Sequence, residues 1–156
     1  MTEKLYFNFI QDMFNSATAK ANGINNTTSD PRILTNLLNL IWYCLNPLRI
    51  LLGVPVVVEC AYRCPKLNEL LGGAPTGHPE GYCADIKVNG WSQEKLFYII
   101  LGFVRQGKIE VDQLIWEKDS NCVHISYRFG NNRHQTKIRT AKTVNGKKVY
   151  TYTDVN

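Results

Sequence analysis

The sequence predicts an α+β fold, in which a small, mainly antiparallel sheet carries helices packed on one side. Apolar residues recur at helical spacing after Asp30 and again after Ser92, whereas VPVVVECAYR is a β-branched run typical of a buried strand. The polar segments KDSN and Asn145-Gly146 each separate two β-prone runs and therefore indicate two hairpins.

The 156 residues suffice for one domain with its own core. We expect a single domain over 1–156. Its core is expected over about 30–139, and a C-terminal hairpin extension over 140–156.

Helices are expected in the first third of the chain. A short one is predicted from about Lys4 to Ala17, before a polar loop. Asp30 is a plausible N-cap with Pro31 at the first helical position of the next helix, and Asn46-Pro47 is expected to kink or restart that helix.

Strands and helices alternate in the remainder. VPVVVECAYR is followed by the short helix CPKLNELLGG, which begins with proline and ends in glycine. A second strand, YCADIKV, precedes an amphipathic helix capped by Ser92. The strands VDQLIWE and CVHISYRF then form the first hairpin.

The net charge of +5 and the pI near 9.0 favour an anionic partner, which can be nucleic acid, membrane or cell wall. Positive residues gather in NNRHQTKIRTAKTVNGKK, where a solvated tail is the simpler interpretation. No nucleic-acid recognition motif accompanies them, so a nucleic-acid partner is not predicted. The five cysteines are expected to be buried, reduced thiols, with one disulfide as the alternative.

Neither a signal peptide nor a membrane span is predicted. MTEKLYFNFIQDMF has acidic residues and no smooth apolar core, and polar residues interrupt the most apolar region, ILTNLLNLIWYCLNPLRILLGVPVVV. Synthesis in the cytoplasm is therefore expected.

Three residues are candidate metal ligands. His78 and Asp85 flank a glycine-rich turn, and His124 lies on the strand face opposite Val123 and Ile125. A catalytic zinc takes three protein ligands and keeps an open position for water. Each residue taken singly also fits a structural role.

Glu117 is the candidate general acid/base. If KDSN is a four-residue turn, Ile115 pairs with His124, and Glu117 becomes a diagonal neighbour of that histidine on the same face. Asp119 within the turn is the rival carboxylate. Arg63, at the end of a buried strand, suits recognition of a substrate carboxylate, with an ion pair to a nearby glutamate as the alternative.

These motifs resemble the zinc D-Ala-D-Ala carboxypeptidase family, especially compact phage and bacterial murein peptidases. The resemblance covers most of Leu34 to Ser126, and its motifs occur in the family's order: CAYRCPKLNELLGG, TGHPEGYCADI, DQLIWE and CVHISY. It implies the hedgehog/D-Ala-D-Ala peptidase-like fold.

The resemblance implies a zinc peptidase that cleaves peptidoglycan stem peptides, as a D-Ala-D-Ala carboxypeptidase or a murein endopeptidase. The zinc ligands would be His78, Asp85 and His124, and Glu117 the catalytic acid/base. Arg63 would hold a substrate carboxylate, and Thr76 would position substrate or support its loop. The cysteines at 60, 83 and 122 depart from the family pattern, and a cysteine-containing zinc site is an alternative to buried packing.

The rival from another class is a catalytically inactive zinc fold that binds the cell wall or belongs to a virion. For the enzyme, a substrate outside the cytoplasm indicates a phage endolysin, released to the wall through a membrane pore.

Overall fold

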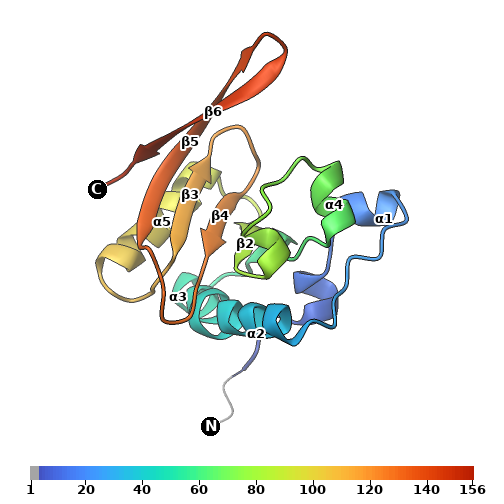
Figure 1. Ribbon diagram of the computed structural model, residues 1–156. Coiled ribbons are helices and arrows are strands. Elements are labelled where there is room, and N and C mark those ends of the chain that lie inside the picture. Colours follow the sequence, from blue (N-terminus) through green and yellow to red (C-terminus); the bar gives the residue numbers. More distant parts are fainter. Residues whose placement is uncertain (1–3) are drawn as a thin grey trace.

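The computed structural model describes residues 4–156, so the first three residues of the predicted domain lie outside the described part. It contains a six-stranded sheet in the order β1-β2-β4-β3-β5-β6, which confirms the predicted α+β class (Figure 1). Neighbouring strands are antiparallel except for the parallel pair β3–β5. The strands are β1 Val57–Cys60, β2 Cys83–Lys87, β3 Gln113–Glu117, β4 Val123–Ser126, β5 Gln135–Val144 and β6 Lys147–Asp154.

Helices cover one face of this sheet, and the opposite face carries polar side chains. Alternation along the strands directs Ala84, Ile86, Leu114, Val123 and Ile125 into a core shared with α2, α3 and α5. The helical elements are η1 Phe9–Met13, α1 Ala17–Ala21, α2 Pro31–Leu40, η2 Ile41–Leu45, α3 Asn46–Leu52, α4 Pro65–Leu70, η3 His78–Glu80 and α5 Gln93–Arg105.

The prediction of one helix from Lys4 to Ala17 is wrong. The chain forms two short helical segments there, η1 and α1. Asn8 accepts a hydrogen bond from the Gln11 N–H and Ser16 accepts one from the Ala19 N–H, so each side chain caps a separate helix start. Local capping thus divides a segment whose apolar spacing suggested a continuous helix.

The predicted start at Asp30 and the irregularity at Pro47 are both confirmed. The Asp30 carboxylate accepts from the Arg32 N–H at 2.9 Å. The helical path continues through the π-helical segment η2 immediately before Asn46. Proline lacks the N–H that would bond four residues back, and the wider turn accommodates this loss.

The predicted C-terminal hairpin is formed by β5 and β6, and it projects from the body of the molecule (Figure 1). Asn145 and Gly146 have φ values of 49° and 75°, as a tight two-residue hairpin turn requires. The first strand already begins at Gln135, where it pairs with β3. The hairpin is therefore joined to the strand that carries Glu117.

Among residues 4–156, no helix has the length and apolar character needed to cross a membrane.

Candidate active site

Strand register brings the central residues of the site together. Ile115 pairs with His124 across β3 and β4, as the turn length predicted, and Asp85 pairs with His124 across β2 and β4. Because side chains alternate along a strand, Asp85, His124 and Glu117 lie on the face opposite the helices. The strand pairings thus bring Asp85 onto one surface with Glu117 and His124, which lie 32 and 39 positions later in the chain.

The glycine-rich loop returns His78 to this surface. Gly81 has φ +80°, and a Cβ there would lie 2.8 Å from the Ile33 carbonyl oxygen, so only glycine fits the bend. The Gly77 N–H donates to the Glu80 carboxylate at 3.0 Å, which closes the short turn. The imidazole of His78 is then oriented by a 2.6 Å contact between Nδ1 and the Ala61 carbonyl oxygen.

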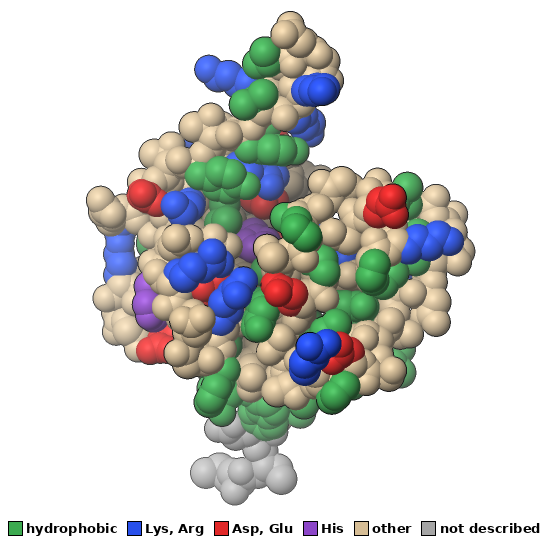
Figure 2. Space-filling view, in the orientation of Figure 1, with side chains coloured by type: hydrophobic (Ala, Val, Ile, Leu, Met, Phe, Trp, Pro, Cys, Tyr) green, Lys and Arg blue, Asp and Glu red, His purple; other side chains and the backbone are tan. Residues whose placement is uncertain are grey.

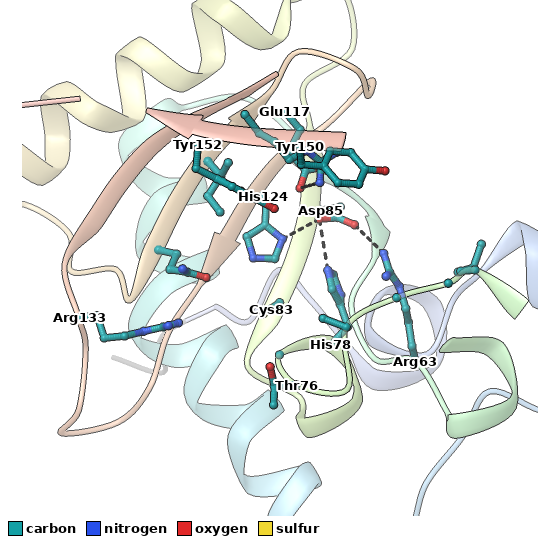
Figure 3. Close-up of a pocket in the computed structure, with 18 of the residues that line it drawn as sticks. Arg63, Thr76, His78, Cys83, Asp85, Glu117, His124, Arg133, Tyr150 and Tyr152 are labelled. Carbon is teal, nitrogen blue, oxygen red and sulfur yellow. Dashed lines mark hydrogen bonds and ion pairs between the residues drawn. The ribbon is translucent and has the colours of Figure 1, made fainter. Parts of the chain in front are cut away.

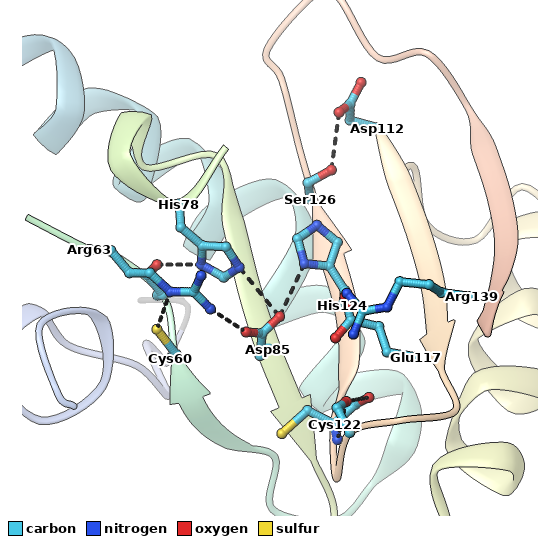
Figure 4. A network of polar contacts seen from close by, with 12 residues as sticks. Cys60, Arg63, His78, Asp85, Asp112, Glu117, Cys122, His124, Ser126 and Arg139 are labelled. Atoms are coloured by element: carbon cyan, nitrogen blue, oxygen red, sulfur yellow. Dashed lines mark hydrogen bonds and ion pairs between the residues drawn. The ribbon is translucent and has the colours of Figure 1, made fainter. Parts of the chain in front are cut away.

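Asp85 is the hub of the cluster (Figures 3 and 4). Its Oδ1 lies 3.0 Å from Nδ1 of His124 and 3.4 Å from Nε2 of His78. Its Oδ2 accepts from Nη2 of Arg63 at 3.1 Å. All three predicted ligands therefore converge, with side chains only 10–15% exposed.

The electrostatics of the cluster favour charged forms in the absence of a metal. Burial raises the pKa of Asp85, but the charges of His78 and His124 outweigh it and hold that pKa well below its usual value. Burial acts in the other direction on His124 and lowers its pKa, but the charge of Cys83 and the hydrogen bond with Asp85 outweigh burial and raise that pKa to about 10. A bound metal ion would replace the protons that lie between the Asp85 carboxylate and the two imidazoles.

Two thiols join the cluster, which adds donors to the predicted ligand set. The ligand atoms of Cys60, His78 and Asp85 lie within 4.8 Å of one another, as do those of His78, Cys83 and His124. Thiolate, imidazole and carboxylate are the donor types that zinc takes in proteins, so the residues present fit a zinc ion. The five cysteines are free thiols.

Glu117 faces the cluster while tied to the C-terminal hairpin. Its Oε1 accepts from Nη1 of Arg139 at 2.7 Å, and the two remaining nitrogens of that guanidinium bind Asp119, each at 3.0 Å. Burial, together with the negative charge of Asp85, raises the pKa of Glu117. Glu117 lines the pocket and the rival Asp119 does not.

The pocket is a cavity of about 580 Å³ that appears as a hollow on one face of the molecule (Figure 2). Arg63 and Thr76 both line it, together with the three predicted ligands and Glu117. The alternative ion pair of Arg63 with a neighbouring glutamate is not formed: the arginine binds Asp85, and Glu59 binds Lys87.

The sequence interpretation missed several lining residues. Arg128 and Arg133 follow β4, and Arg139, Tyr150 and Tyr152 come from the hairpin. The late cluster of positive charge, interpreted above as a solvated tail, was the available signal for Arg133 and Arg139, whereas Arg128 lies outside that cluster. No local pattern indicated that the hairpin would fold over the site.

Comparison with known proteins supplies an independent observation. The family model described as Peptidase M15 matches residues 8–126, from before η1 to the end of β4. The match contains Arg63, Thr76, Glu117 and the three candidate ligands, whereas β5 and β6 lie beyond it. No curated protein matches the chain. Because the match covers well over half of the sequence, the chain belongs to the peptidase M15 family, a family of zinc metallopeptidases similar to D-Ala-D-Ala carboxypeptidases.

Proposed function

We propose that the protein is a zinc-dependent peptidase that cleaves peptidoglycan stem peptides, as a D-Ala-D-Ala carboxypeptidase or a murein endopeptidase. His78, Asp85 and His124 hold the zinc, and Glu117 is the general acid/base. The observation that carries the proposal is the convergence of these four side chains in one pocket, within the segment that matches the family.

When bound, zinc supplies a Lewis acid that polarises the scissile carbonyl and lowers the pKa of its water ligand. Glu117 would accept the proton that the attacking water loses as the water oxygen bonds to the carbonyl carbon. The carboxylic acid so formed then donates the proton to the leaving amine when the C–N bond breaks. The raised pKa of Glu117 supports this role, since a base that later acts as an acid works best near the operating pH.

Arg63 orients the substrate through a carboxylate. The guanidinium is fixed by Asp85 on Nη2 and by the Cys60 sulfur on Nε, at 3.1 and 3.2 Å. An arginine held in this way loses little conformational entropy when it binds an anion in the pocket. Thr76, on the exposed part of the loop before His78, lines the same pocket and positions the substrate or supports the loop.

The basic balance of the chain suits an anionic cell wall, and the lining arginines suit peptides with free carboxylates. We also propose that the enzyme is made in the cytoplasm and reaches the cell wall as a phage endolysin.

Metal analysis combined with digestion of purified peptidoglycan tests the proposal. We expect about one zinc per chain and release of muropeptide products by the wild type but not by Glu117→Gln. Mass spectrometry of the products distinguishes removal of a terminal D-Ala from cleavage inside the peptide or its cross-link.

A zinc-loaded wild type that binds peptidoglycan and releases nothing would support the inactive wall-binding module instead. Absence of zinc binding would contradict the ligand assignment.

A further inference from the structure

We infer that Cys83 gives the pocket a second metal-binding arrangement, formed by His78, Cys83 and His124, which selects soft divalent ions such as Cd²⁺. This arrangement shares two histidines with the proposed zinc site but replaces the Asp85 carboxylate by a thiolate. It goes beyond the proposed function, because the family resemblance assigns no metal to a cysteine at this position.

The strand places Cys83 where a third ligand is needed. Cys83 and Asp85 are two residues apart on β2 and therefore point to the same face. The three ligand atoms of His78, Cys83 and His124 lie within 4.8 Å of one another, and all three residues are buried. Figure 3 shows Cys83 between the loop of Thr76 and the two imidazole rings.

Gly77 keeps the thiol in this position. A Cβ at Gly77 would lie 2.8 Å from Sγ of Cys83, so the sulfur packs directly against the backbone of the loop that carries His78. A side chain at position 77 would displace the sulfur or the loop. The same glycine that permits the tight turn, with φ +88°, also leaves room for a sulfur ligand.

The two imidazoles can serve both arrangements, one ion at a time. Nδ1 of His78 is committed to the Ala61 carbonyl, which leaves Nε2 as its metal donor in either case. Nδ1 of His124 contacts Asp85, and Nε2 on the other side of the ring remains for a metal bound to Cys83. Because His78 offers one free nitrogen, the two arrangements compete with each other.

Chemistry decides which ion each arrangement prefers. Thiolate is a softer donor than carboxylate and favours softer ions, whereas two imidazoles suit either kind. When the metal binds Cys83, the S–H bond breaks, the sulfur keeps the electron pair for the metal, and the proton passes to the buffer. The step needs no oxidant or other reactant.

Cys60 is the competing thiol and is less available. Its sulfur accepts a hydrogen bond from Nε of Arg63 at 3.2 Å. The group of neighbouring ligand atoms that contains Cys60, formed with His78 and Asp85, also needs the Asp85 carboxylate, which Arg63 binds. Sγ of Cys83 instead interacts with His124, a member of its own group of metal-binding residues. Cys122 belongs neither to the group with Cys83 nor to the group with Cys60, and it serves as a matched control.

Titration of the metal-free full-length protein with Cd²⁺ tests the inference. The readouts are the near-ultraviolet thiolate-to-cadmium charge-transfer absorption and the ratio of Cd²⁺ to Zn²⁺ affinity in competition. We expect the absorption in wild type, Cys60→Ser and Cys122→Ser, and its loss in Cys83→Ser, with at least a tenfold fall in the affinity ratio. Cys83→Ala is a second variant if serine disturbs folding, and circular dichroism checks both.

An absorption that persists in both Cys83 variants would overturn the inference, as would its loss in Cys60→Ser alone. The result also separates this inference from the proposed function. Zinc binding without any cadmium–thiolate signal overturns only the role of Cys83, whereas failure of both ions to bind overturns the metal site and the function with it.

Discussion

The two ends of β3 each carry a carboxylate that is paired with an arginine, but their environments differ. Asp112 precedes the strand and Glu117 ends it, and Arg133 and Arg139 are their respective partners. The pKa of Asp112 is lowered to about 2, whereas that of Glu117 is raised. An ion pair with arginine is therefore not sufficient to predict whether the pKa of a buried carboxylate is lowered or raised.

Donor number explains the behaviour of Asp112. Burial raises the pKa of Asp112. Against this, its carboxylate accepts hydrogen bonds from the backbone N–H, Nε and Nη2 of Arg133 and from the Ser126 hydroxyl, the last shown in Figure 4. Nε of Arg128 also lies 3.3 Å from its Oδ2. These donors favour the ionised form and outweigh burial. With its side chain 1% exposed, Asp112 is a structural anchor between β3, β4 and the loop before β5.

Glu117 lacks such a set of donors. It receives one nitrogen of Arg139, and Asp119 takes the other two. The negative charge of Asp85 adds to burial and raises the Glu117 pKa. In this pair, the carboxylate with many donors has the lowered pKa, and the carboxylate beside Asp85 has the raised pKa.

The largest expected effect is on catalysis, at the Glu117 end. Glu117→Gln preserves size but cannot accept the proton, so hydrolysis of peptidoglycan peptides should fall by about 10²–10⁴-fold. The midpoint of thermal unfolding should change little. Glu59→Gln, which alters a carboxylate in β1 outside the pocket, is the control. Equal activity of Glu117→Gln and wild type would direct attention to Asp119 as the base.

Asp112→Asn, in contrast to Glu117→Gln, should mainly lower the free energy of unfolding. A pKa lowered from 3.8 to about 2 corresponds to roughly 2 kcal/mol of unfolding free energy at neutral pH. Because the folded-state pKa is the lower one, this stability is present above pH 4 and disappears as pH falls toward 2. Urea unfolding of both proteins at pH 7 and pH 3 should show the difference narrowing.

Glu110→Gln, a change at an exposed neighbour, should leave the unfolding free energy unchanged. An Asp112→Asn protein as stable as wild type at pH 7 would contradict the structural role of Asp112.

Arg139→Met should widen the difference between the pKa values of Glu117 and Asp112. Arg139 lowers the Glu117 pKa, so its removal should raise that pKa and move the acidic limb of the kcat/KM profile to higher pH. Arg139→Lys retains a positive charge and should produce a smaller displacement. An unchanged profile in Arg139→Met would show that the hairpin does not influence the base.

The smallest effect is expected from Ser126→Ala. It removes one of the donors to Asp112, at 3.0 Å, and should cost about 1 kcal/mol of unfolding free energy. In the Asp112→Asn background the same change should have less effect, because the charged acceptor is gone. Additive effects in this double-mutant cycle would argue against a direct interaction.

Much of the fold and part of the site were predictable because they depend on local rules. The four residues of KDSN determined that Ile115 faces His124, and strand alternation then placed Glu117 on the same face. The N-terminal helix was mispredicted because the Asn8 and Ser16 caps compete with apolar spacing. The pairing of Arg139 with Glu117 was not predictable, since it depends on a parallel strand pair between distant segments.

The sequence by itself determined the α+β class, the hairpin turns and an ordered set of residues able to form a metal site, because turn chemistry and side-chain periodicity act over a few residues. Only the tertiary structure decided that Asp85 lies between two imidazoles, that Cys83 faces the same histidines and that Arg139 divides its charge between two carboxylates. These features depend on distances between segments far apart in the chain, and packing of the sheet and the Gly77–Gly81 turn sets those distances.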